Sequence, residues 1–396
     1  MKILRSVLAS FGLLVTSCTL LFAQSQASQH AAVLVPDSTV EHAQDIGQRA
    51  HTNHLIHVGP HFIGTAPAGE TPTSIRRVYA LPTSLTTGGS GTIAIVDAFD
   101  YSTAANDLSV FSTRFGLPAC TTANGCFKKV YATGTKPEGN CGWGQEAALD
   151  IEWAHAMAPK AKIVLIEAAT NSLADLFHAV DVATAHVTTG GGAGEVSMSW
   201  GGSEFSTEAG HDGHFQNINV VYFAASGDAG GVNIYPSTSP YVVSAGGTTI
   251  HRNSSGAFTS ETGWSGSGGG PSKYETKLSY QNNVAGTNTT KRSAPDFSFD
   301  ADPNSGVSVY DSTRCQGLSG WLVFGGTSVS SPSLAGIVNQ AGGASSTVSE
   351  LKTIYANRTN TSDFRDITSG TAGGFNAHSG WDFVTGVGSP KGLNGK

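Results

Sequence analysis

The chain has 396 residues, of which 39% are hydrophobic and 13% are charged, and its formal net charge is −7. This length allows one large domain or two ordinary ones, and the apolar share is enough for a large buried core. The sequence contains no basic cluster, which excludes nucleic acid as an expected partner.

The first residues predict an export signal over residues 1–27. A basic start precedes an apolar stretch that runs to about Phe22, and small residues allow cleavage after Ala23 or Ala27. Cys18 raises the alternative of a lipid anchor, although the residues before it fit that signal poorly. The apolar stretch is too short to span a membrane, and no later segment has the character of a transmembrane helix. We therefore expect a secreted protein, extracellular or periplasmic, with no membrane span.

Residues 28–70 form a short segment with poor periodicity and much histidine. It carries six of the 13 histidines of the chain: His30, His42, His51, His54, His57 and His61. Because histidine gains charge as the pH falls through about 6.5, this segment could be a pro-segment that masks the protein in a pH-sensitive way. A flexible spacer or linker is an equally open interpretation.

Beyond residue 79, short apolar runs alternate with helical patterns. Strands are predicted at residues 92–97, 162–167, 196–199, 220–225 and 242–245, and helices at 102–115 (capped by Ser102), 146–158 and 172–186. This alternation predicts an α/β fold, with a parallel sheet covered by helices on both faces. Residues 251–290 are rich in Ser, Thr, Asn and Gly, and we expect long surface loops there.

Four cysteines remain after the export signal: Cys120, Cys126, Cys141 and Cys315. An even number in an exported chain favours disulfides, and three pairings are possible. One of them closes the short loop between Cys120 and Cys126 and leaves the other two to pair. Free thiols fit an exported chain less well, and a zinc site fits less well still because no paired CxxC spacing exists.

Ser328 stands in the strongest local motif, Gly325–Pro332, which starts an apolar helical pattern. A serine at a helix N-terminus lies beside free N–H groups and the positive end of the helix dipole, which favour an oxyanion. Taken alone, the motif is equally compatible with a serine-rich helix cap. A nucleophilic serine also needs a base.

Glu146 and Asp150 are candidates for that base and its partner. They are four residues apart, so on a helix their side chains share one face. Their neighbours are mostly apolar, which favours a buried pair with separated pKa values over a solvated acidic face. A pair of this kind can act as a base and a proton partner.

Asp228 follows the predicted strand at residues 220–225, in the turn Ser226-Gly227-Asp228. The carboxyl end of a parallel strand is where α/β sheets place their ligands. A protonated Asp228 could donate a hydrogen bond to an oxyanion, while an ordinary aspartate in a glycine turn is the alternative.

Together these motifs resemble the sedolisin family, the serine-carboxyl peptidases, which are similar in fold to subtilisins. The family pattern is a Glu-x-x-x-Asp helix, a Ser-Gly-Asp turn and a Gly-Thr-Ser-x-x-x-Pro helix start, in that order. The resemblance covers residues 71–396 as a single catalytic domain and implies serine-type endopeptidase activity in acid. It implies Ser328 as nucleophile, Glu146 as general base, Asp150 as the acid that holds it and Asp228 as the oxyanion acid. It also includes the segments Tyr235–Tyr241, Gly246–Thr248, Ser267–Gly270 and Pro295–Ser298.

The resemblance implies two further sites. The edge at Ser199, Trp200 and Gly201 would pair with an extended protein or peptide substrate, although a tight turn with a packed Trp fits those residues equally. A calcium loop near the C-terminus would bind one Ca²⁺ through two Asp side chains and nearby carbonyls: Asp366, Ile367, His378, Gly380 and Asp382. His378 replaces what is often a glycine in the family.

The short N-terminal segment departs from the family, whose members usually carry a long, folded activation domain. We expect self-cleavage near residue 70 and a monomeric product. Two alternatives stay open. One is an exported binding protein that keeps the scaffold without cleaving, and the other is a subtilisin-like enzyme that uses His155 or His211 with Asp97.

Overall fold

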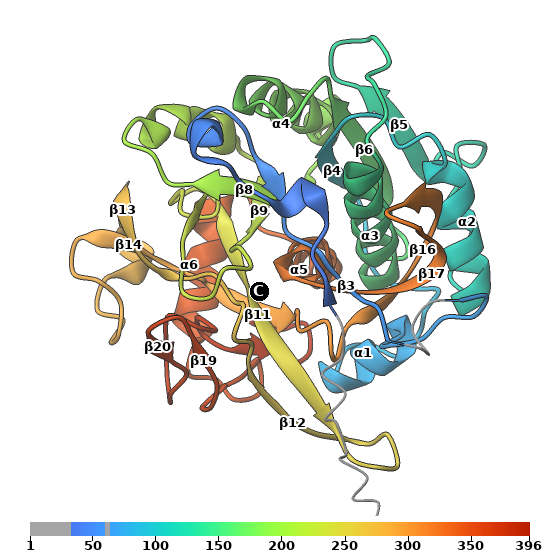
Figure 1. Ribbon diagram of the computed structural model, residues 1–396. Coiled ribbons are helices and arrows are strands. Elements are labelled where there is room, and N and C mark those ends of the chain that lie inside the picture. Colours follow the sequence, from blue (N-terminus) through green and yellow to red (C-terminus); the bar gives the residue numbers. More distant parts are fainter. Residues whose placement is uncertain (1–32, 60–63) are drawn as a thin grey trace, which may run out of the picture. The chain divides into compact units, whose positions relative to one another are not determined.

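A mostly parallel sheet forms the centre of the structure, a computed structural model that describes residues 33–59 and 64–396 (Figure 1). Its strand order is β12-β11-β9-β7-β4-β6-β5, and β15 also pairs with β11. Only the pairing of β11 with β12 is antiparallel among these strands. The strands are β4 (Thr92–Ala98), β5 (Phe127–Tyr131), β6 (Lys162–Ala168), β7 (Gly194–Met198), β9 (Val220–Ala225), β11 (Val243–Arg252), β12 (Phe258–Gly263) and β15 (Phe297–Asp300).

Helices cover both faces of this sheet because alternate residues of its strands point to opposite sides. Ile93 and Ile95 of β4 pack in one apolar cluster with α3 and α5, while Ala94 and Val96 pack in a second cluster with α4. The α/β prediction is therefore confirmed. The helices are α1 (Pro72–Val78), α2 (Ala104–Phe115), α3 (Cys141–Met157), α4 (Leu173–Thr188), α5 (Thr327–Ala341) and α6 (Thr347–Asn357).

The local signals at helix starts explain where the predicted boundaries hold and where they fail. Ser172 caps α4 as its side chain accepts a hydrogen bond from the backbone N of Asp175. Ser102 does not cap α2, which begins at Ala104 after Thr103. The helix predicted from Glu146 begins five residues earlier, because the side chain of Asn140 accepts hydrogen bonds from the first turn of α3.

The prediction of long surface loops at residues 251–290 is wrong in part. This region contains β12 and β13 (Gly270–Thr276), and β13 pairs with β14 (Lys291–Ala294). Both strands carry polar side chains that stay exposed, such as Thr259 and Ser260 of β12. A polar strand at the margin of a fold has the same composition as a loop, because only one of its faces is buried.

The disulfides join Cys120 to Cys126 and Cys141 to Cys315, which is one of the three pairings left open by the sequence. The second bond ties the first residue of α3 to the last residue of β16 (Val307–Cys315). Strand β16 forms a hairpin with β17 (Leu318–Gly325), which leads directly into α5. The disulfide thus links the start of α3 covalently to the hairpin that leads into α5.

The N-terminal segment, in blue in Figure 1, packs along this framework through short strands and two 3-10 helices, Asp37–Thr39 and Ala43–Asp45. Strand β2 (His51–Thr52) pairs antiparallel with β8 (Trp200–Ser203), which also pairs with β10 (Ile234–Tyr235). Strand β3 (Leu55–His57) pairs antiparallel with β17 and with β1 (Val33–Leu34). The segment therefore crosses from the edge of β8 to the edge of β17 at residues 53 and 54.

The C-terminal residues form two short strand pairs. Strand β18 (Phe364–Arg365) pairs with β21 (Ser389–Pro390), and β19 (Thr371–Ala372) pairs with β20 (Phe375–Asn376). The predicted export signal, residues 1–27, lies outside the described residues. Within the described part of the chain, every helix is too short or too polar to cross a lipid bilayer.

Candidate active site

Ser328 lies in the first turn of α5, fully buried. Strand β17 ends at Gly325, and Gly326 turns the chain into the helix with φ 95°, a left-handed conformation that favours glycine. The Ser328 hydroxyl donates to the carbonyl oxygen of Ser199 at 3.2 Å, and its backbone N donates to the carbonyl oxygen of Asn53 at 3.0 Å. The helix N-terminus thus already holds a carbonyl oxygen of the chain itself.

Glu146 and Asp150 both lie on α3 and are fully buried. Glu146 Oε2 accepts hydrogen bonds from Asn53 N at 3.1 Å and from His54 Nδ1 at 2.9 Å, while Oε1 has no partner. Asp150 Oδ1 accepts from the Ser199 hydroxyl at 2.8 Å. Burial, reinforced by the charges of Asp97 and Glu146, raises the pKa of Asp150 well above its usual range.

Ser199 connects the two helices. Its hydroxyl bonds to Asp150 on α3, and its carbonyl accepts from the Ser328 hydroxyl on α5. The sequence predicted Ser199 as a residue of the substrate edge, and the structure places it between the nucleophile candidate and the carboxyl pair as well. In the resting structure the Ser328 hydroxyl donates to this carbonyl and not to Glu146.

Asp228 lies in the turn after β9 and faces the start of α5. Its Oδ1 accepts hydrogen bonds from the backbone N and the hydroxyl of Thr327, both at 2.8 Å. Its Oδ2 is buried and has no hydrogen-bond partner. Burial, with a smaller effect from the charge of Glu146, raises the pKa of Asp228 to about 7. The carboxyl group is therefore protonated in acid and can donate a hydrogen bond.

The space around Gly326 shows what Asp228 faces. A Cβ placed on Gly326 would lie 2.2 Å from the carbonyl oxygen of Asn53 and 2.5 Å from Asp228 Oδ2. Both oxygens therefore converge on one point beside the N-terminus of α5. The backbone N–H of Ser328 donates to this carbonyl oxygen, and the Asp228 carboxyl lies on the other side of the same point. Donors placed around a carbonyl oxygen in this way can stabilise an oxyanion.

Asp97, at the carboxyl end of β4, is a third buried carboxyl group in this region. Neither of its oxygens has a hydrogen-bond partner. Burial, then the charges of Glu146 and Glu167, raises its pKa well above the usual range. The sequence suggests Asp97 only as a partner for a histidine. Its position at the end of a buried parallel strand was the signal that could have placed it with the carboxyl pair.

The histidines of the alternative enzyme do not join Asp97. His155 Nε2 bonds to the carbonyl oxygen of Pro118, and burial lowers the pKa of His155 to about 4. His211 stacks on Phe177 at 4.8 Å between ring centroids. The histidine that does reach the site is His54, from the N-terminal segment, and no local sequence signal distinguishes it from the other histidines there.

The predicted substrate edge is a strand, β8, and its backbone partner is the N-terminal segment. Gly201 pairs with His51, and Trp200 pairs with Thr52. The Trp200 side chain is fully buried and donates from Nε1 to the carbonyl oxygen of Val96 at 2.8 Å. Trp200 therefore anchors the strand, and the backbone of β8 is the part that binds an extended chain.

Asp366 and Asp382 lie in the C-terminal loops, as the predicted calcium site requires. The backbone N of Gly380 donates to both oxygens of Asp366, and that of His378 donates to Asp382 Oδ2 at 3.2 Å. Burial raises the pKa of Asp382. A bound cation would oppose that cost, so the two carboxylates fit the group. Ile367 is buried beside them.

A second group of metal-ligating residue types is ruled out by its chemistry. Cys120, Cys126 and His155 bring their ligand atoms within 4.8 Å of one another. The two sulfur atoms are joined in a disulfide, so neither is available as a thiolate ligand.

The raised pKa values of the buried carboxyl groups predict how the free energy of unfolding depends on pH. A group whose pKa is raised on folding keeps its proton in the native state while the unfolded chain loses it. The stabilisation is complete below the unfolded value of about 4 and is lost as the pH rises toward the folded value. We expect the free energy of unfolding to fall from pH 4 to pH 8. In the Asp97→Asn variant this fall should be shallower, by up to about 1.4 kcal/mol per pH unit.

Urea denaturation at several pH values measures this slope. Asp37→Asn is the matched control because the Asp37 side chain is exposed, and it should leave the slope unchanged. Equal slopes for wild type and Asp97→Asn would contradict a buried, protonated Asp97.

Known proteins resemble this chain in sequence. Curated relatives include sedolisin from Pseudomonas sp. (strain 101), 34% identical over 205 residues, which are 48% of this chain and 33% of the relative. Kumamolisin from Bacillus sp. (strain MN-32) is 30% identical over 372 residues, covering 83% of this chain and 63% of the relative. Xanthomonalisin from Xanthomonas sp. (strain T-22) is 32% identical over 179 residues, covering 39% of this chain and 21% of the relative. The chain thus spans less than two thirds of each of these relatives. No family model matches it.

Solved structures lead to the same group. A structure of Pseudomonas sedolisin, described as a serine-carboxyl proteinase with two molecules of pseudo-iodotyrostatin, matches with a TM-score of 0.67 and 25% identity, covering 83% of this chain and 96% of that one. Sphericase shares the fold at a TM-score of 0.50 and 17% identity, covering 80% of this chain and 99% of that one. From its motifs, its fold and these matches, the chain belongs to the sedolisin family of serine-type peptidases.

Proposed function

We propose that this chain is an exported serine-carboxyl endopeptidase that hydrolyses peptide bonds in acid. The proposal rests on the position of one peptide carbonyl group, that of Asn53, at the N-terminus of α5. The oxygen of Asn53 meets the N–H of Ser328 and lies beside the protonated carboxyl of Asp228, with Glu146 bonded to the N–H of the same residue. A peptide substrate held in the same way has its scissile carbonyl in an oxyanion site.

In the proposed reaction Ser328 attacks the substrate carbonyl carbon, and Glu146 takes the hydroxyl proton. The free Oε1 of Glu146 is the acceptor for this proton, because Oε2 is already bonded. Asp150, protonated through its raised pKa, stabilises the charge on Glu146, and Asp228 donates to the oxyanion. A histidine would be charged in acid and could not accept the proton, whereas a carboxylate still can.

The substrate backbone would pair with β8 in the manner of β2, through Gly201 and the carbonyl of Ser199. Extended pairing gives affinity through main-chain hydrogen bonds that any peptide offers. The proposed substrates are therefore proteins or peptides in an extended conformation.

Removing the nucleophile or the base should abolish turnover. We expect Ser328→Ala and Glu146→Gln each to lower kcat/KM on a denatured protein at pH 4 by about 10² to 10⁴. Ser333→Ala, a buried serine on the same helix whose hydroxyl has no partner, and Glu152→Gln, a buried glutamate on α3, are the controls and should keep most activity. Full activity in either active-site variant, or no cleavage by wild type, would disprove the assignment; the second result is what a non-cleaving binding protein gives.

The raised pKa of Asp228 predicts how kcat/KM falls at the alkaline end of the pH profile. Because the pKa of Asp228 is raised to about 7, its donor proton is present below that pH and is lost above it. We expect kcat/KM of the wild type to fall between pH 6 and 8. Asp228→Asn keeps a donor at every pH, so this limb should flatten even though the variant is slower overall. A limb that is unchanged in the variant would assign the titration to another group.

Calcium would support the C-terminal loops without taking part in the chemistry. Asp366 and Asp382 would supply the charge, with carbonyl oxygens from Ile367, His378 and Gly380. At free calcium 100 times Kd, the ion should add about 2.7 kcal/mol to stability. Thermal unfolding with calcium and with a chelator measures this. The difference should disappear in Asp366→Ala and persist in Asp37→Ala, and a difference that persists in both would place the ion elsewhere.

A further inference from the structure

We propose that the peptide bond between Asn53 and His54 is this peptidase's own first substrate. The inference rests on the proposed function, because it uses the same nucleophile and base. Contacts on both sides of this bond place it, among the described bonds of the segment, at the N-terminus of α5.

The first contacts are to the carbonyl of Asn53. Its oxygen accepts from Ser328 N at 3.0 Å and lies at the point beside Gly326 that Asp228 Oδ2 also approaches. This is the position of the carbonyl under attack in the proposed reaction. The residue on the acyl side of the cut is therefore Asn53.

The remaining contacts fix the register on both sides. Before the bond, the N–H of Asn53 donates to the carbonyl of Ser199, and β2 pairs with β8. After the bond, β3 pairs with β17, where Leu55 lies opposite Gly325. A shift of one residue along either strand would turn its side chains to the opposite face. The pairings of β2 with β8 and of β3 with β17 therefore hold the Asn53–His54 bond in one position.

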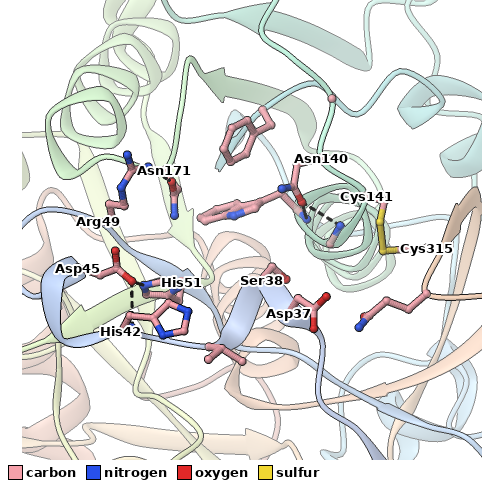
Figure 2. A pocket seen from close by; sticks show the side chains of 16 residues that line it. Asp37, Ser38, His42, Asp45, Arg49, His51, Asn140, Cys141, Asn171 and Cys315 are labelled. Carbon is pink, nitrogen blue, oxygen red and sulfur yellow. Dashed lines mark hydrogen bonds and ion pairs between the residues drawn. A yellow bond between two sulfur atoms is a disulfide. The ribbon is translucent and has the colours of Figure 1, made fainter.

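The segment also blocks the site. Figure 2 shows its Asp45 and His51 on one side of a cavity of about 520 Å³, opposite Asn140 and Cys141 at the start of α3. This cavity separates the segment from the start of α3, while the backbone of β2 is paired with β8. As long as β2 occupies the edge of β8, no other peptide can pair there.

His54 explains how the seated bond can stay intact. Its Nδ1 lies 2.9 Å from Glu146 Oε2, and its ring stacks on Phe324 at 5.3 Å between centroids. At the same time the Ser328 hydroxyl donates to Ser199 and not to Glu146. The base is thus engaged by the leaving-group residue until the Ser328 hydroxyl turns toward Oε1.

The cut balances as an ordinary hydrolysis. The Ser328 oxygen bonds to the Asn53 carbonyl carbon while Glu146 takes its proton. The bond to His54 N then breaks, and the amine of His54 leaves with that proton. Water hydrolyses the ester, which releases a fragment ending in the Asn53 carboxylate and leaves His54 as a new N-terminus. Glu70, where a cut near residue 70 would fall, lies elsewhere: its carboxylate pairs with Arg252 and its backbone with Val307.

The test follows the full chain after transfer from pH 7.5 to pH 4, by intact mass and by sequencing both new ends. We expect a fragment ending at Asn53, formed at a first-order rate that does not change over a tenfold range of protein concentration. Ser328→Ala should slow its formation by at least about 100-fold. This control also excludes spontaneous cleavage through the asparagine side chain.

An unrelated peptide, assayed in parallel, separates the two hypotheses. Cleavage of that peptide with an intact Asn53–His54 bond would overturn the inference and leave the proposed function standing. Failure to cleave either would overturn the function itself. A fragment that forms equally in Ser328→Ala, or at a rate that rises with concentration, would also overturn self-cleavage within one chain.

His54→Ala tests the restraint on the base. A hydrogen bond to a charged group is worth about a factor of ten or more, so the variant should cut itself about tenfold faster than wild type. His42→Ala is the matched control, an exposed histidine of the same segment, and should cut at the wild-type rate. A slower cut in His54→Ala than in His42→Ala would show that His54 assists the reaction and does not restrain it.

Discussion

The cost of burying carboxyl groups governs this site. Glu146, Asp150 and Asp97 are all removed from water, and within the described residues no lysine or arginine forms an ion pair with any of them. An uncompensated buried charge is unfavourable, so burial raises the pKa values of Asp150 and Asp97. The fold therefore favours the protonated forms, which exist in acid. A site with this constraint suits chemistry in which one carboxylate is a base and its neighbours remain neutral acids.

The N-terminal segment provides the polar contacts that the empty cleft would lack. Asn53 and His54 donate to Glu146, and the strands on each side of them satisfy the edges of β8 and β17. Two open strand edges would otherwise expose unpaired backbone groups. The same contacts that protect the cleft also present a peptide to the nucleophile. In the proposed reaction, inhibition and self-cleavage would be two outcomes of one binding mode, and the direction of the Ser328 hydroxyl proton would decide between them.

Much of the fold and most of the candidate site followed from local patterns in the sequence. The strand at residues 220–225 has its predicted bounds because its apolar run is buried on both faces. Glu146 and Asp150 were recognised from their spacing on one helix, and Ser328 from the glycines before it. These features depend on residues that are neighbours in the chain, which is the range that sequence patterns describe.

The features that were missed depend on contacts distant in the chain. His54 reaches Glu146 across 92 positions, and nothing around His54 distinguishes it from the other histidines of its segment. Asp97 joins the site only because β4 lies beside α3. The strands between residues 251 and 290 are polar because one face is exposed, so their composition resembles that of loops. The backbone pairing of β2 with β8 needs no particular side chain and therefore leaves no signal in the sequence.

The pH dependence of kcat/KM from pH 2 to 8 on a small peptide, measured with processed protein, tests the central claim most directly. A carboxylate base predicts that kcat/KM is already high at pH 5, where a free imidazole is charged and cannot accept a proton. A single rise centred near pH 6.5, with little activity below pH 5, would show that an imidazole accepts the proton and would contradict the account.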